Sequence, residues 1–181
     1  AVNLAIGLER SDGKVMLLGR SPGAADWTRI EVAGVQSRGL DVRVVDVLPA
    51  LTVPEQDQRH GARLHDRDPA ACCRMRKVEP LRAALRGYEA WVTGVRREEG
   101  PTRAGTPLVT FDEANGLVKV NPIAGWTFDE LVDHAARTGV PVNVLLSDGY
   151  PSIGCEPCTA RVAPGGDPRS GRWAGVAKTE C

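Results

Sequence analysis

Short apolar runs alternate with amphipathic segments along this chain. The runs predict strands at residues 14–18, 41–47, 90–95, 108–111 and 117–120. Asn115 and Gly116 lie in the predicted turn between the last two strands, where a left-handed backbone is commonly needed. Strands that alternate with helices predict an α/β fold, with a mostly parallel sheet covered by helices on both faces.

Capping signals predict where the helices lie, at residues 26–36, 69–78, 80–87 and 128–139. Asp68 followed by Pro69 is typical of a helix start, because Asp accepts free N–H groups and Pro suits the first turn. Residues 127–130, Thr-Phe-Asp-Glu, form a capping box. Beyond Pro141 the chain is rich in Gly and Pro, so we expect mostly loop.

The 181 residues suit one α/β domain with a sizeable core. Lys and Arg number 23 and so do Asp and Glu, so no overall field favours nucleic acid or membrane. No apolar run approaches the roughly 20 residues that span a bilayer. The apolar residues 1–8 lack a preceding basic stretch and predict no signal peptide. We therefore expect a cytoplasmic protein, in which cysteines serve metal binding or thiol chemistry rather than disulfides.

Four of the five cysteines form two pairs, Cys72-Cys73 and Cys155-x-x-Cys158. Four thiolates suit a [4Fe–4S] cluster, and they suit tetrahedral zinc equally in number. Adjacent helical cysteines point about 100° apart, which a cluster with four iron corners accommodates more easily than one ion. Spacing alone leaves both metals open, with iron–sulfur slightly ahead. A buried pair without metal does not explain the distant Cys-x-x-Cys.

The fifth cysteine, Cys181, ends the given sequence after Lys178, Thr179 and Glu180. A terminal thiol near a basic group is a candidate nucleophile. On spacing alone, a lone terminal cysteine is more often incidental.

Several segments together resemble the assimilatory adenylyl-sulfate reductases, the iron–sulfur type of the sulfonucleotide reductase family. In chain order they are CCRMRKVEPL (72–81), AWVTGVRR (90–97), PTRA (101–104), VKVNP (118–122), GYPSIGC (149–155), PC (157–158), DPRSGRW (167–173) and TEC (179–181). The similarity extends from about residue 41 to residue 181. We therefore interpret residues 1–163 as one reductase domain, followed by a C-terminal segment, 164–181.

The resemblance implies reduction of adenosine 5′-phosphosulfate to sulfite and AMP, with thioredoxin as electron donor, in sulfate assimilation and cysteine biosynthesis. In such enzymes the cysteine that matches Cys181 attacks the sulfate sulfur and becomes a thiosulfonate. The resemblance also implies a [4Fe–4S] cluster on Cys72, Cys73, Cys155 and Cys158, which shapes the site electrostatically. The two cysteine pairs favour the substrate without a 3′-phosphate.

Four basic residues match or approach the family's anion-binding positions. Arg169 and Arg172 match arginines that hold the phosphosulfate, and guanidinium groups bind such oxyanions bidentately. Lys77 matches a lysine between cluster and substrate, and Arg103 is a weaker candidate for the same anion. The alternative interpretation is that these side chains belong to an ordinary solvated surface.

The N-terminal part departs from the family pattern. The family fold resembles the PP-loop fold of the adenine nucleotide alpha-hydrolases, whose Ser/Gly-rich loop binds phosphate; Ser21 and Gly23 are the candidates for that loop. The family's Leu-Asp-Thr-Gly-like strand end has no match, so we expect an abbreviated N-terminal part. The family also continues Gly-Leu-His after the residue that matches Cys181.

These departures leave two alternatives to an active reductase. One is a cluster-bearing but catalytically impaired homologue or fragment, and the other is a zinc-stabilised binding module without catalysis. Nothing in the sequence predicts an oligomeric state.

Overall fold

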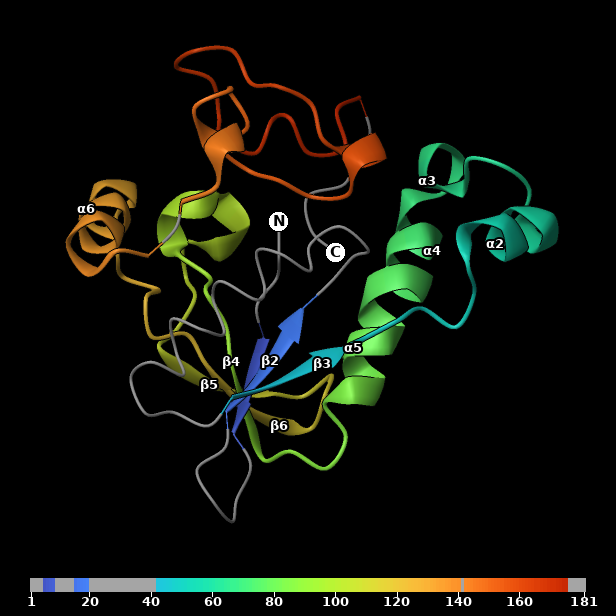
Figure 1. The fold of residues 1–181 in the computed structure, drawn as a ribbon, viewed down its shortest axis with the longest axis horizontal. Helices are drawn as coiled ribbons and strands as arrows, with labels where there is room; N and C mark the ends of the chain where they lie inside the picture. Colours follow the sequence, from blue (N-terminus) through green and yellow to red (C-terminus); the bar gives the residue numbers. More distant parts are fainter. Residues whose placement is uncertain (1–4, 9–14, 20–41, 141, 176–181) are drawn as a thin grey trace. The chain divides into compact units, whose positions relative to one another are not determined.

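A computed structural model describes residues 5–8, 15–19, 42–140 and 142–175 of the chain. The contacts divide the chain into two compact units, each described by itself below. The cysteine unit contains Val47–Ala84 and Val144–Cys181, together with Ala1. The sheet unit contains Val2–Asp46 and Leu85–Asn143 (Figure 1).

The sheet unit is built on a mixed sheet with the strand order β3-β2-β1-β4-β6-β5. Its strands are β1 (Ala5–Leu8), β2 (Val15–Gly19), β3 (Val42–Asp46), β4 (Ala90–Val92), β5 (Val109–Asp112) and β6 (Leu117–Val120). The five predicted strands are confirmed as β2 to β6. The first strand was not predicted, because its apolar residues were considered only as a leader segment.

The sheet is not mostly parallel, so that part of the prediction is wrong. Strand β2 pairs in parallel with β3, and β4 with β6, but the pairs β1–β2, β1–β4 and β5–β6 are antiparallel. The physical reason lies in the connections: β1–β2 and β5–β6 are joined by short segments, which return the chain in the opposite direction. The α/β class is confirmed, and the placement of helices on both sheet faces stays a prediction.

The turn between β5 and β6 confirms the predicted role of Asn115 and Gly116. Asn115 Nδ2 donates to Asp112 Oδ2 at 2.8 Å, and its backbone N–H donates to Asp112 Oδ1 at 3.2 Å. Gly116 has a φ of 72°, in the left-handed region that glycine adopts without strain.

Asn121, directly after β6, is the most deeply buried polar residue among those of the sheet unit whose burial the structure describes, with no exposed surface. Its Nδ2 donates to the carbonyl oxygen of Pro107 at 2.9 Å, and its Oδ1 accepts a short hydrogen bond from Thr93 Oγ1. Leu117 and Ala124 are buried in the same unit. The Asn121 amide thus connects the segment after β4 with the segment before β5 by hydrogen bonds.

Helix α6 (Phe128–Thr138) begins and ends as the sequence predicts. Thr127 and Glu130 form both halves of the capping box, and Gly139 ends the helix with a φ of 69°. Glu98 adds a third contact at the start, since its Oε2 accepts from the N–H of Phe128 at 2.5 Å.

The helices of the cysteine unit are α2 (Val53–His60), α3 (Leu64–Arg67), α4 (Pro69–Cys73), the π-helical turn η1 (Arg74–Val78) and α5 (Glu79–Ala84). The last three run on without a break, so the two helices predicted at residues 69–87 are one. Helices α2 and α3 were not predicted. The helix predicted at residues 26–36 lies outside the described residues.

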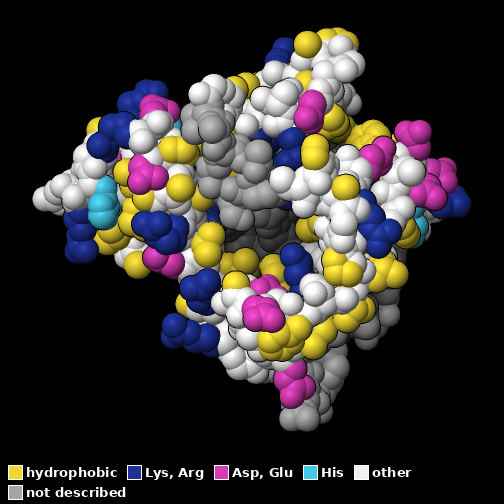
Figure 2. Space-filling view, turned by 180° about the vertical axis from the view of Figure 1, so that it is seen from behind, with side chains coloured by type: hydrophobic (Ala, Val, Ile, Leu, Met, Phe, Trp, Pro, Cys, Tyr) yellow, Lys and Arg dark blue, Asp and Glu magenta, His cyan; other side chains and the backbone are white. Residues whose placement is uncertain are grey.

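Residues 144–175 of the cysteine unit are mostly loop, as predicted, with the short 3-10 turns η4 (Val144–Leu146) and η5 (Glu156–Cys158). On the face drawn in Figure 2, basic and acidic side chains lie interspersed, in keeping with the balanced charge. Among the described residues, no helix is long and apolar enough to cross a membrane.

Candidate cysteine site

The first cysteine pair lies at the end of helix α4. Asp68 caps the helix, its Oδ1 accepting from the N–H of Ala71 at 2.8 Å, and Pro69 occupies the first turn. This N-cap fixes the residue at which the helix begins. Cys73 is buried, with 7% of its surface exposed, whereas Cys72 is half-buried.

The π-helical turn η1 follows the cysteines directly. Its backbone closes with the N–H of Glu79 donating to the carbonyl oxygen of Arg74, five residues back. A π turn takes one more residue than an α turn, and such turns are frequent at functional sites. Arg76 and Lys77, both on this turn, lower the pKa of the Cys72 thiol by their positive charge.

The second cysteine pair lies on the turn η5, which Thr159 holds closed. Thr159 Oγ1 accepts from the N–H of Gly154 at 2.9 Å and donates to the carbonyl oxygen of Cys155 at 2.8 Å. The N–H of Cys158 donates to the Cys155 carbonyl oxygen at 2.9 Å. Both cysteines are half-buried. The Cys-x-x-Cys segment is therefore a fixed turn.

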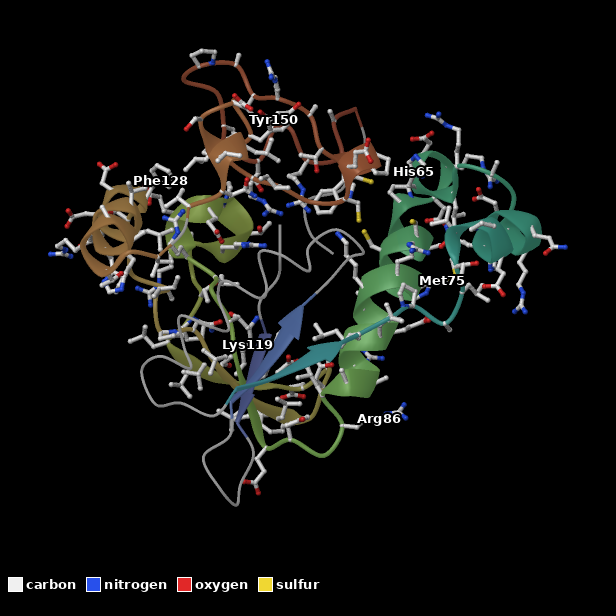
Figure 3. All side chains as sticks on the ribbon, viewed as in Figure 1. His65, Met75, Arg86, Lys119, Phe128 and Tyr150 are labelled. Atoms are coloured by element: carbon white, nitrogen blue, oxygen red, sulfur yellow. The ribbon has the colours of Figure 1, made fainter. Side chains whose placement is uncertain are left out.

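Cys72 and Cys155 come from these two segments and lie close enough to interact electrostatically. Burial raises the pKa of the Cys72 thiol above its ordinary value, and the charge of Cys155 raises it further. Arg76 and Lys77 act in the opposite direction, as does a hydrogen bond from Gln56. Figure 3 shows yellow sulfur atoms between α4 and the η5 turn.

The described residues fit an iron–sulfur cluster in their donor chemistry. Four cysteines of the cysteine unit are not joined in disulfides: Cys72, Cys73, Cys155 and Cys158. Among the described residues, no group of three or more His, Cys, Asp or Glu side chains is gathered closely enough to hold one metal ion. Four thiolates match the number of ligands that a [4Fe–4S] cluster takes.

Arg172 is held against the Cys-x-x-Cys segment. Its Nη1 donates to the carbonyl oxygen of Ile153 at 3.1 Å and to Ser152 Oγ at 3.3 Å. Its Nε is buried and has no hydrogen-bond acceptor among the described residues. The guanidinium also covers the Trp173 ring, 4.6 Å from its centroid. This cation is partly desolvated and has a donor to spare, which favours an anion as partner.

Arg169 also lies near Trp173, with its guanidinium carbon 6.0 Å from the ring centroid. Trp173 is 5% exposed and has a φ of 52°, so the ring is fixed by the backbone as well as by packing. The structure thus places Arg169 and Arg172 near one indole, and their role in anion binding stays a prediction.

The structure places the other predicted site residues as follows. Lys77 is half-buried on η1, in the unit that holds the cysteines. Arg103 belongs to the sheet unit, where its Nη1 lies 2.5 Å from Glu99 Oε2. Ser21, Gly23 and Cys181 lie outside the described residues.

Gln56 is the site residue that the sequence analysis missed. It lies on α2, is 4% exposed, and accepts a hydrogen bond from Arg76 Nη1 at 3.4 Å. One signal was available, because Thr52 and Glu55 form a capping box of the same kind as the one recognised before α6. That signal locates the helix, although it does not reveal the contact.

Comparison with known proteins decides the family. The profile of the phosphoadenosine phosphosulfate reductase domain matches residues 28–161. The chain belongs to this family. The resemblance predicted from the sequence motifs is therefore confirmed.

Curated reductases of this family match about three-quarters of the chain. Adenosine 5′-phosphosulfate reductase of Mycolicibacterium smegmatis is 59% identical over 141 residues, covering 78% of this chain and 60% of the relative. The protein of the same name from Mycobacterium tuberculosis strain H37Rv is 60% identical over 141 residues, covering 78% and 56%. That of Rhodococcus erythropolis is 56% identical over 140 residues, covering 77% and 57%. The chain thus spans 56 to 60% of the length of these relatives.

A solved structure of the reductase family agrees with the fold. The crystal structure of phosphoadenylyl-sulfate reductase from Candida auris, a phosphate complex, matches with a TM-score of 0.62 and 25% identity. The match covers 83% of this chain and 73% of that one.

Proposed function

We propose that this chain carries out the thioredoxin-dependent reduction of adenosine 5′-phosphosulfate to sulfite and AMP, in the cytoplasm, for sulfate assimilation and cysteine biosynthesis. The observation that carries the proposal is the approach of Cys72 to Cys155, in the same unit as Arg169 and Arg172. Identity of 56 to 60% to curated adenosine 5′-phosphosulfate reductases supports the choice of substrate.

A [4Fe–4S] cluster on Cys72, Cys73, Cys155 and Cys158 is part of the proposal. When bound, it supplies a fixed local charge and holds the two cysteine segments together. The residues around it have their own tasks. Lys77 offsets the negative thiolates and contributes positive charge towards the anionic substrate.

Cys181 is the proposed nucleophile. Its thiolate attacks the sulfur of the sulfate group, the bond from that sulfur to the bridging phosphate oxygen breaks, and AMP leaves with the electron pair. The product is a thiosulfonate on Cys181. A dithiol of thioredoxin then supplies two electrons, which releases sulfite, restores the thiol and leaves thioredoxin as a disulfide.

Arg169 and Arg172 are proposed to bind the phosphosulfate. The spare Nε donor of Arg172 supports this role, as does the position of both guanidinium groups around Trp173. Positive charge at these positions stabilises the negative charge that develops on the departing phosphate. Arg103 is proposed as a further anion contact, and Ser21 and Gly23 as contacts of the nucleotide phosphate.

The test is intact-mass analysis of the anaerobically purified chain after incubation with adenosine 5′-phosphosulfate. We expect one sulfite adduct, mapped to Cys181 and lost on addition of reduced thioredoxin. Cys181→Ser is the matched control and forms no adduct. A wild-type chain that stays unmodified, although it contains stoichiometric iron, indicates the catalytically impaired homologue. A colourless chain with stoichiometric zinc indicates the binding module instead.

The 3′-phosphorylated nucleotide, assayed in competition, tests substrate choice. We expect the adduct on Cys181 to form faster with the non-phosphorylated nucleotide. Faster formation with the 3′-phosphorylated nucleotide would overturn that assignment.

A further inference from the structure

The backbone of Arg172 is paired with the segment that carries the second cysteine pair. Arg172 forms an isolated antiparallel bridge with Thr159. Next to this bridge, the N–H of Trp173 donates to the carbonyl oxygen of Cys158 at 3.1 Å. These contacts set the position of the Arg172 backbone. The direction of its side chain, which reaches the residues before Cys155, is fixed by other contacts.

The guanidinium of Arg172 has five N–H donors, and its three nitrogens differ in their partners. Nη1 donates to the carbonyl oxygen of Ile153 at 3.1 Å and to Ser152 Oγ at 3.3 Å, so both N–H groups of this nitrogen are used. Among the described residues, neither Nε nor Nη2 donates to an acceptor, and Nε is buried. The contacts thus leave the Nε–Nη2 edge, on which two parallel N–H groups bind an oxyanion bidentately.

Ser152 is the one partner of the Arg172 Nη1 nitrogen that contributes a side chain. The Ile153 carbonyl oxygen belongs to the main chain, and a guanidinium held by that oxygen alone can still rotate within its own plane. The Trp173 ring, 4.6 Å from the guanidinium carbon, restrains the tilt of this plane but not rotation within it. A second acceptor on Nη1 prevents that rotation. The half-buried Ser152 hydroxyl supplies this acceptor.

We propose that Ser152 is a positioning residue for Arg172, whose hydroxyl directs the Nε–Nη2 edge towards the phosphosulfate group of the substrate. The inference rests on the proposed function, in which Arg172 binds that group. A bidentate contact requires both N–H groups to face the oxyanion at once, so a guanidinium that rotates loses one of the two hydrogen bonds. Ser152 acts through Arg172 and does not itself contact the substrate.

Four variants isolate this role. Ser152→Ala removes the acceptor, whereas Ser152→Thr keeps a hydroxyl on the same carbon. Ser147→Ala is the matched control, since it makes the same exchange at an exposed serine of the same unit. Arg172→Lys keeps the positive charge but has no planar fork to direct. Combined with Ser152→Ala, it completes a double-mutant cycle that measures the coupling of the two residues.

The measurements use the full 181-residue chain, purified anaerobically, with the iron content of each variant determined first. Affinity for adenosine 5′-phosphosulfate is measured by isothermal titration in a Cys181→Ser background, and the rate of adduct formation with Cys181 intact. We expect Ser152→Ala to lower the affinity about tenfold and to slow the adduct, because a hydrogen bond to a charged group is lost. Ser152→Thr and Ser147→Ala should stay within about twofold of the wild type.

The double-mutant cycle distinguishes positioning from a purely structural role of Ser152. In the Arg172→Lys chain, Ser152→Ala should lower the affinity by less than about twofold, because the edge that it directs is absent. Equal losses with and without Arg172, or wild-type affinity and adduct rate in Ser152→Ala, overturn the proposal. If Ser152→Ala does not fold, Ser152→Gly, which also lacks the hydroxyl, decides. A wild-type chain that neither binds the nucleotide nor forms the adduct overturns the proposed function, and this inference with it.

Discussion

The guanidinium of Arg172 lies directly against the backbone of Gly154. A β-carbon at position 154 would stand 2.5 Å from Arg172 Nη2 and 2.7 Å from both Cζ and Nε. The φ of Gly154 is not in the left-handed region, so the close approach of the guanidinium, and not the backbone conformation, favours glycine here. An arginine of the C-terminal part thus packs on the residue that precedes the second cysteine pair.

Gly154→Ala is therefore expected to displace Arg172 and to loosen the turn at Cys155. We expect weaker retention of iron and a sulfite adduct that forms at least about tenfold more slowly, as for other losses of supporting contacts. Iron analysis and the rate of adduct formation check this. Gly105→Ala is the control, since nothing lies within 4 Å of a β-carbon there. Equal behaviour of the two variants would contradict the expectation.

Thr159 offers a test of the Cys-x-x-Cys turn with the side-chain shape nearly unchanged. Thr159→Val removes the hydroxyl that binds the Gly154 N–H and the Cys155 carbonyl oxygen. We expect a loss of about 1–3 kcal/mol in the free energy of unfolding, because the two backbone groups lose their partner. Urea unfolding measures it. Thr159→Ser keeps the hydroxyl and should restore most of the stability; if it is as unstable as Thr159→Val, the methyl group and not the hydroxyl matters.

Asn121 gives a prediction for the sheet unit. Asn121→Ala removes an amide with no exposed surface, so that the Pro107 carbonyl oxygen and the Thr93 hydroxyl lose their partner. We expect a loss of about 1–3 kcal/mol in the free energy of unfolding for the unsatisfied groups, and more where a cavity remains. Chemical unfolding checks this. Asn115→Ala in the β5–β6 turn is the comparison and should cost less, because Asn115 is not fully buried.

The capping box of α6 predicts a pH dependence. Hydrogen bonds from the Thr127 backbone N–H and hydroxyl lower the pKa of Glu130 below its ordinary value of 4.5. A carboxyl whose pKa is lower in the folded chain contributes stability above the unfolded pKa, and that contribution is lost as the pH falls through the folded pKa. Glu130→Gln should therefore narrow the difference in melting temperature between pH 7 and pH 3. If the difference in melting temperature is the same in Glu130→Gln and in the wild type, the Glu130 carboxyl does not contribute to stability.

Local signals predicted much of the fold. The Asp68-Pro69 start and the Thr127–Glu130 box gave correct helix starts, because capping needs only neighbouring residues. The order of the sheet was not predictable in this way. Strand β1 pairs with β4 across more than 80 residues, and no local pattern specifies that partner. Its antiparallel pairs with β2 and β4, together with the β5–β6 pair, make the sheet mixed.

The sequence indicated candidate residues for the site, but not the contacts that hold these residues in place. Sequence motifs named the two cysteine pairs, Arg169 and Arg172, and their roles stay predictions. The hydrogen bond of Gln56 with Arg76 depends on how α2 lies relative to η1, a tertiary relationship with no local signature. The approach of Arg172 to Gly154 is of the same kind. Contacts between residues that are distant in the sequence were therefore the part of the site that the sequence did not predict.

The π-helical turn η1 makes the number of residues between the first cysteine pair and α5 a constraint of its own. Deleting one residue within Arg74–Val78 would turn the wide turn into a regular α turn, so that α5 keeps nearly its present face while the residues inside the turn change position relative to Cys72. Arg76 or Lys77 would then turn away from the sulfur, although no side chain had been altered in character. Insertions and deletions in this five-residue stretch should accordingly be tolerated far less well than conservative exchanges.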